Sequence, residues 1–195
     1  LNRFHRHDWP FASTPLVHES FLDSEGVVDS GLEWSWLTPL PFFLDVTFGV
    51  ASGYTFGHTH SEGSRPEVPT AYARPATYFS TGETSGAELG VTVLYRRDST
   101  SSGMRLLGLD FTLKDRKQKT LSFLLQSEVW YKQLVSASSS NDVGAYVYPE
   151  FGIDPQWSIG SRLDYLEGDS SDGYQLAAVP TVTFKNSEFS RFRLE

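Results

Sequence analysis

Residues 105–115, RLLGLDFTLKD, place an apolar side chain at every second position. Leu107, Leu109, Phe111 and Leu113 alternate with Gly108, Asp110, Thr112 and Lys114. Because successive side chains of a strand point to opposite faces, this stretch predicts a strand with one apolar and one polar face. In a soluble β protein the apolar face packs inward, whereas in a membrane barrel it faces lipid. The function depends on which face is turned outward.

The same alternation recurs along the chain, and no convincing amphipathic helix interrupts it. Further strands are predicted at 31–36, 42–50, 88–96, 121–132 and 157–165, with weaker ones at 74–80, 144–153, 175–185 and 189–195. Pro180 donates no ladder hydrogen bond, so we expect it at a bulge or at an edge. The pattern predicts an all-β fold, an antiparallel up-and-down meander of about ten strands that forms a transmembrane β-barrel or part of a larger one.

The connections between these strands alternate between tight and loose. Tight ones are expected at 38–41, 81–86, 115–119, 154–156 and 185–188, and longer ones at 1–26, 54–73, 98–103, 133–143 and 166–174. Short turns at one rim and longer loops at the other are typical of bacterial outer-membrane barrels. We therefore expect residues 1–195 to form a single, partial barrel domain, with 1–26 as an outer loop segment and the strands in 27–195.

Composition narrows the class of protein. The 195 residues include no cysteine, which excludes a disulfide framework and thiolate metal sites. A net charge of -8 argues against a nucleic-acid partner, which would require a basic face. No stretch approaches the roughly 18 uninterrupted apolar residues of a membrane helix, so a membrane protein with this sequence would cross with strands.

Four tyrosines end strands that rise from a tight turn toward a loose loop. They are Tyr54, Tyr95, Tyr131 and Tyr165, and each falls on the apolar parity of its strand. A tyrosine ring is apolar and its hydroxyl favours the headgroup region, so these positions predict an interfacial aromatic girdle. The alternative is that they are ordinary core tyrosines at the end of a barrel.

The opposite, polar face mixes charges of both signs with small residues. The residues predicted to line a lumen are Asp45, Glu88, Arg96, Asp110, Gln126, Glu128, Arg162 and Asp164. Opposite charges on neighbouring strands can pair across a water-filled interior. A soluble barrel could present the same residues on its outer surface.

Two pairs of histidines lie in segments expected at the loop rim. His5 and His7, and likewise His58 and His60, are two positions apart, so in an extended segment each pair would share one face and could grip a zinc ion. His-rich tracts are a weak metal signal, and the alternative is polar loop residues without a ligand. No other cofactor is expected.

The run HRHDWPF at 5–11, the Pro-Leu-Val at 15–17, the Glu-Gly at 25–26 and the hairpin SWLTPLPF at 35–42 carry a family resemblance, as does SEFSRFRLE at 187–195. Together they resemble a family of Gram-negative outer-membrane proteins of porin type. Its members are described as zinc-regulated or TonB-dependent and are similar to phosphate-selective porins. The resemblance spans most of the chain and implies an outer-membrane location, solute passage and a longer whole protein. These residues contain no plug domain and no TonB-box-like segment, so TonB-coupled uptake gets no direct support.

The leading hypothesis is therefore a bacterial outer-membrane channel that passes small solutes or ions, with the lipid bilayer as its partner and a homo-oligomer left open. One alternative is a soluble ligand-binding β-barrel with its apolar side inward. A second is a metal-binding receptor surface on the outer membrane. An enzyme is not expected, because the serine runs contain no Gly-x-Ser-x-Gly elbow and the histidines lie elsewhere.

Overall fold

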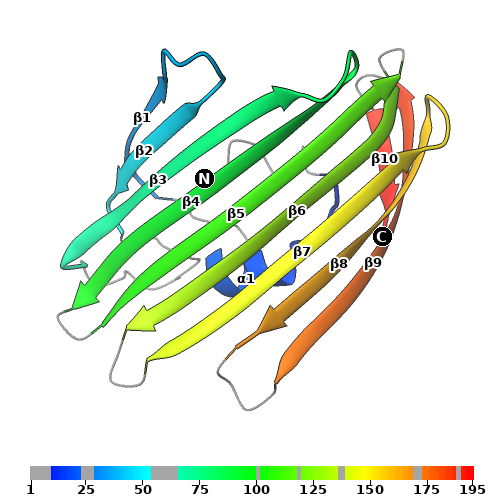
Figure 1. The fold of residues 1–195 in the computed structure, drawn as a ribbon. Coiled ribbons are helices and arrows are strands. Elements are labelled where there is room, and N and C mark those ends of the chain that lie inside the picture. The colour runs from blue at the N-terminus through cyan, green and yellow to red at the C-terminus, as the bar shows by residue number, and fades with distance from the viewer. Residues whose placement is uncertain are drawn as a thin grey trace.

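The computed structural model describes residues 10–22, 29–53, 66–99, 102–117, 120–135, 139–168, 173–187 and 190–195. It contains ten strands and one short helix (Figure 1). The strands are β1 Gly31–Leu37, β2 Asp45–Ala51, β3 Val68–Ser80, β4 Ser85–Ser99, β5 Ser102–Lys117, β6 Thr120–Val135, β7 Ser140–Gly152, β8 Trp157–Glu167, β9 Tyr174–Ser187 and β10 Ser190–Leu194; the helix is α1 Leu16–Leu22. The predicted all-β fold is confirmed.

All ten strands form one antiparallel sheet in sequence order, so the predicted up-and-down meander is also confirmed. The sheet is open: β1 and β10 are its two edges and do not pair with each other. Figure 1 shows the sheet as a curved layer, with α1 on the side toward which the sheet curves. That helix contacts β7 and β8. The sheet therefore has a convex face and a concave face that carries the helix.

The alternation in RLLGLDFTLKD separates these two faces. Leu109 pairs with Val91 on β4 and with Val129 on β6, so apolar side chains of neighbouring strands continue one another across the convex face. Leu109 is 48% exposed and Ile159 on β8 is 46% exposed. Polar residues of the opposite parity, such as Arg162, are buried on the concave face. The apolar side of the ribbon is thus turned outward.

The strands extend further than the hydropathy pattern indicates. A loose connection was expected at 98–103, but β4 ends at Ser99 and β5 begins at Ser102, and these two residues pair. The backbone ladder continues through polar residues because main-chain hydrogen bonds do not depend on side-chain hydropathy. The predicted alternation of tight and loose connections is therefore wrong here, because the connection between β4 and β5 is tight.

The N-terminal stretch also differs from the prediction. Residues 1–26 were expected to form an outer loop without a helix, but residues 16–22 form α1 and lie on the concave face. Val17, Phe21 and Leu22 are buried on one side of this helix. A helix of seven residues offers too few turns for its periodicity to be recognised in the sequence.

Candidate functional site on the concave face

The site is formed by the concave side of β6, β7 and β8 together with residues 10–22, hereafter the inner segment. Phe11 of the inner segment is 2% exposed and lies edge-on to the rings of Tyr146 and Tyr148, with ring centroids 5.6 and 5.5 Å away. Val17 is fully buried. Burying apolar side chains of this size stabilises the docked segment by roughly 1.5–3 kcal/mol each.

A glycine on β7 allows this close approach. A Cβ atom placed on Gly144 would lie 2.5 Å from Cγ2 and 2.8 Å from Cβ of Val17. Any side chain at position 144 would therefore push the inner segment away from the sheet. Glycine is required here for packing, and the sequence pattern gave no indication of it.

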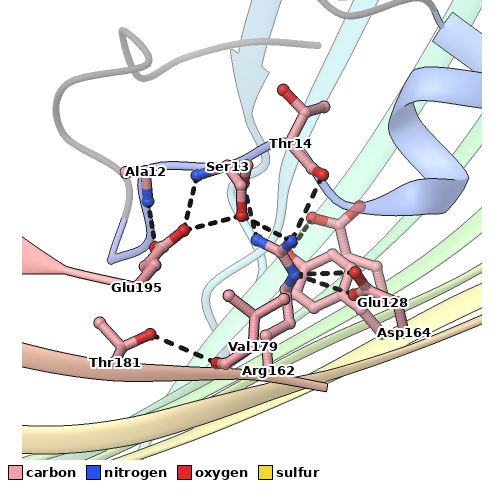
Figure 2. A network of polar contacts seen from close by, with 10 residues as sticks. Ala12, Ser13, Thr14, Glu128, Arg162, Asp164, Val179, Thr181 and Glu195 are labelled. Atoms are coloured by element: carbon pink, nitrogen blue, oxygen red, sulfur yellow. Dashed lines mark hydrogen bonds and ion pairs between the residues drawn. The ribbon is translucent and has the colours of Figure 1, made fainter. Parts of the chain in front are cut away.

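Arg162 on β8 connects the sheet to the inner segment (Figure 2). Its Nε donates to both carboxylate oxygens of Asp164, at 2.9 and 3.1 Å. Its Nη1 donates to the carbonyl oxygen of Ser13 at 2.6 Å, and its Nη2 donates to Ser13 Oγ at 3.0 Å and to the carbonyl oxygen of Thr14 at 3.3 Å. The guanidinium carbon also lies 4.6 Å from the centre of the Phe11 ring. Arg162 thus bonds Asp164 of its own strand through Nε and bonds the inner segment through Nη1 and Nη2.

Glu128 on β6 forms a second junction of the same kind. Its Oε2 accepts hydrogen bonds from Trp130 Nε1 and lies 2.7 Å from His18 Nε2 of α1. Its Oε1 accepts from the hydroxyl of Tyr146 at 2.7 Å. Nearby, Lys132 Nζ donates to the carbonyl oxygen of Ser20 at 3.2 Å. The carboxylate is therefore satisfied by the sheet and by the helix together.

Glu195, just after β10, holds the start of the inner segment. Its carboxylate accepts hydrogen bonds from the backbone N–H groups of Ala12 and Ser13 and from the Ser13 hydroxyl. Partial burial acts to raise the pKa of Glu195, but these hydrogen bonds together outweigh it and hold the pKa below its ordinary value. Glu195 comes 183 residues after Ala12 and 182 residues after Ser13 in the sequence.

This pKa predicts how the contact depends on pH. A carboxylate whose folded pKa is depressed stabilises the contact above its ordinary pKa, and the contribution is lost as the pH falls through the lower folded value. We expect amide hydrogen exchange at Ala12 and Ser13 to be slower in the unaltered protein than in Glu195→Gln at pH 6. The ratio of the rate in Glu195→Gln to the rate in the unaltered protein should fall toward one as the pH is lowered from 6 through the depressed pKa of the folded state. A ratio that stays constant over this range would contradict the assignment.

A further charged cluster lies on β3, β4 and β5. Arg74 Nη2 is 2.8 Å from Asp110 Oδ2 and 3.0 Å from Glu88 Oε1. These side chains are part-exposed, whereas the side chains of Arg162 and Asp164 are only 2% and 1% exposed. The concave face thus has a part covered by the inner segment and a part that is more accessible.

The structure assembles the predicted lumen residues into separate groups. Strand register places all eight on the concave side. Glu128, Arg162 and Asp164 lie under the inner segment, which covers them, and their lining of a lumen stays a prediction. Glu88 and Asp110 join Arg74, and Arg96 pairs with Asp98 instead. Asp45 and Gln126 belong to neither cluster.

Three of the four predicted girdle tyrosines are described, and Tyr54 lies outside the described residues. Register places Tyr95, Tyr131 and Tyr165 on the convex side near the ends of β4, β6 and β8. The Tyr131 hydroxyl donates to Asn141 Oδ1 at 2.7 Å, and the Tyr165 hydroxyl donates to Glu167. The rings of Tyr131 and Tyr165 are thus on the apolar face while their hydroxyls reach polar partners.

A second row of aromatic side chains lies at the opposite ends of the strands, which the sequence reasoning missed. Phe123 on β6 contacts Phe151 on β7 with ring centroids 5.0 Å apart, and Trp157 on β8 contacts Phe184 on β9 at 4.6 Å. The available signal was an aromatic residue at the turn end of each of these strands. The convex face is therefore bounded by tyrosines at one end and by Phe and Trp at the other.

The candidate zinc ligands His5, His7, His58 and His60 all lie outside the described residues, so zinc binding stays a prediction. Within the described ranges, no group of three or more His, Asp or Glu side chains is placed to hold a metal ion. Nor do those ranges contain a helix long and apolar enough to cross a membrane.

Comparison with known proteins adds little about function. The chain is 25% identical, over 240 aligned residues, to an uncharacterized protein from Aquifex aeolicus. The match covers the whole of this chain and 50% of the relative, so the chain spans about half the length of the curated protein that it matches. No family model and no solved structure matches.

Proposed function

We propose that the chain is part of an outer-membrane β-barrel channel for small solutes or ions, with its convex face against lipid. The observation that carries the proposal is the distribution of side chains over the sheet. Apolar residues such as Leu109 and Ile159 are exposed on the convex face, while the buried ion pair of Arg162 and Asp164 lies on the concave face. An apolar surface of this extent in contact with water would be strongly unfavourable.

The two aromatic rows support a membrane position for this surface. Phe123 and Tyr131 are eight positions apart on β6, as are Trp157 and Tyr165 on β8. Eight residues of strand span about 27 Å, or about 20 Å across a membrane when tilted by roughly 40°. This is close to the height of the lipid-facing band of known barrels, about 25 Å. Amphipathic tyrosine rings belong at such a boundary.

The alternative of a soluble barrel with an apolar interior is less compatible with these observations. It requires Leu109, Ile159 and their neighbours to pack against one another in a dry centre. Instead about half of each of these two side chains is exposed.

The tryptophans offer a direct test of the lipid-facing side. Trp157 is exposed on the convex face, whereas Trp130 is buried under the inner segment. We expect that lipids brominated near the headgroup end of their acyl chains quench the fluorescence of a variant that keeps only Trp157. A matched variant that keeps only Trp130 should be quenched weakly, because its indole lies on the other side of the sheet. In both variants the other four tryptophans are replaced by Phe, and the protein is folded into vesicles.

Equal quenching of the two variants, or a protein that stays folded and monomeric in plain buffer, would overturn the lipid-facing assignment. Solute passage is tested separately with the whole protein in planar bilayers. Stepwise conductance is expected, and its absence from membranes that contain the folded protein would overturn the channel.

A further inference from the structure

We propose that the inner segment is a releasable plug, which leaves the concave face while the sheet stays folded and thereby opens the path that the proposed channel uses. The inference that the segment is released rests only on contacts within this chain. Its effect on solute passage rests on the proposed function. The argument comes from how each strand residue that holds the inner segment is bonded.

Two of the charged groups that hold the inner segment, Arg162 and Glu128, keep partners on the sheet when it leaves. Arg162 retains both hydrogen bonds to Asp164, which lies two positions away on the same strand. Glu128 retains the Trp130 indole N–H and the Tyr146 hydroxyl, and loses only His18. A buried charge left without a partner is strongly destabilising, and release of the inner segment creates none at these two residues.

The attachment also avoids the sheet's own backbone. Among the described residues, no backbone–backbone hydrogen bond joins the inner segment to a strand. The segment is held by side chains and by apolar packing, so its departure does not interrupt the ladder from β1 to β10. A short element attached in this way forms a unit that can open locally, separately from the strands.

Release would also change what the concave face offers to a solute. Docked, the inner segment buries Trp130, Tyr146 and Tyr148 and occupies the outer edge of Arg162. Once it has left, the Arg162 Nη groups face the interior beside an aromatic surface. The plug therefore controls access to a buried charged group of this face, Arg162.

The absence of cysteine from the chain permits a clean test by single-site labelling. Val17→Cys places a thiol at a fully buried position of the plug, and Phe21→Cys, at a position only 3% exposed, is a second reporter should the first fail to fold. The protein is folded into vesicles and treated with a polyethylene-glycol maleimide. We expect the thiol to react while the protein still migrates as the folded, heat-modifiable form. A thiol that reacts only as fast as the folded form is lost would overturn the proposal.

Two carboxylate variants test whether the described contacts set the rate at which the thiol at position 17 is labelled. Glu195→Gln removes the charge that holds Ala12 and Ser13, and we expect labelling at position 17 to become about tenfold faster. Glu67→Gln is the matched control, because Glu67 pairs with Arg97 and does not contact the inner segment. Equal acceleration by both variants, or by neither, would contradict the proposed attachment.

Conductance measurements distinguish the proposed plug from the proposed channel. The attached polymer cannot fit against Gly144, so labelled protein should be trapped open and conduct more than unlabelled protein. Labelling without any change in a measurable conductance would overturn the blocking role. If neither form conducts although labelling occurs in the folded state, the proposed channel fails and the release of the segment stands.

Discussion

Replacement of Arg162 with Leu is expected to lower the free energy of unfolding by about 3–5 kcal/mol, measured by urea titration of the protein folded in detergent micelles. Arg162 and Asp164 are both buried, and Arg162 is bonded through Nε to Asp164. The substitution leaves the Asp164 carboxylate buried without its cation, and the cost of that uncompensated charge is larger than the strength of the ion pair itself.

A double variant distinguishes this cause from loss of packing. Replacing both Arg162 and Asp164 with Leu removes the stranded charge, so much of the lost stability should return. If the double variant is as unstable as Arg162→Leu alone, the destabilisation comes instead from the contacts that Arg162 makes with Phe11, Ser13 and Thr14.

Replacement of Glu128 with Leu should be the second large effect, at about 2–5 kcal/mol of unfolding free energy. Leu has a similar size but accepts no hydrogen bond, so the Trp130 indole N–H and the Tyr146 hydroxyl lose their acceptor on the concave face. A buried donor without a partner costs about 1–3 kcal/mol.

Glu128→Gln is the matched comparison, because its carbonyl oxygen still accepts hydrogen bonds. We expect it to retain at least half of the stability that Glu128→Leu loses, in the same urea titration. Equal losses in the two variants would mean that the charge of Glu128, and not its role as an acceptor, stabilises the site.

Period-two alternation was sufficient to predict the all-β antiparallel meander. All ten strands and their order follow from local patterns, because each strand pairs only with its neighbours in sequence. Pro180 was expected at a bulge or an edge, and it lies within β9, where it pairs with Ser161 on β8.

The inner segment could not be predicted from the same patterns. Its contacts join Ser13 to Arg162 and His18 to Glu128, residues more than 100 positions apart, and a single sequence contains no signal for such pairs. The concave face was interpreted as uniformly polar. In fact Leu94, Leu106 and Trp130 interrupt the polar parity and form the apolar floor on which the segment packs. Such exceptions to the alternation were the available signal.

The open edges of the sheet have a consequence for how the chain associates. Every residue of β1 is exposed, and the outer sides of β1 and β10 carry main-chain donors and acceptors that no other described strand satisfies. Such an edge is a template for any strand that meets it. Strands contributed by the same polypeptide would close the sheet into a barrel, whereas strands from separate molecules would add edge to edge without limit and grow into fibrils. Low protein concentration would then favour the closed barrel, and high concentration would favour precipitation.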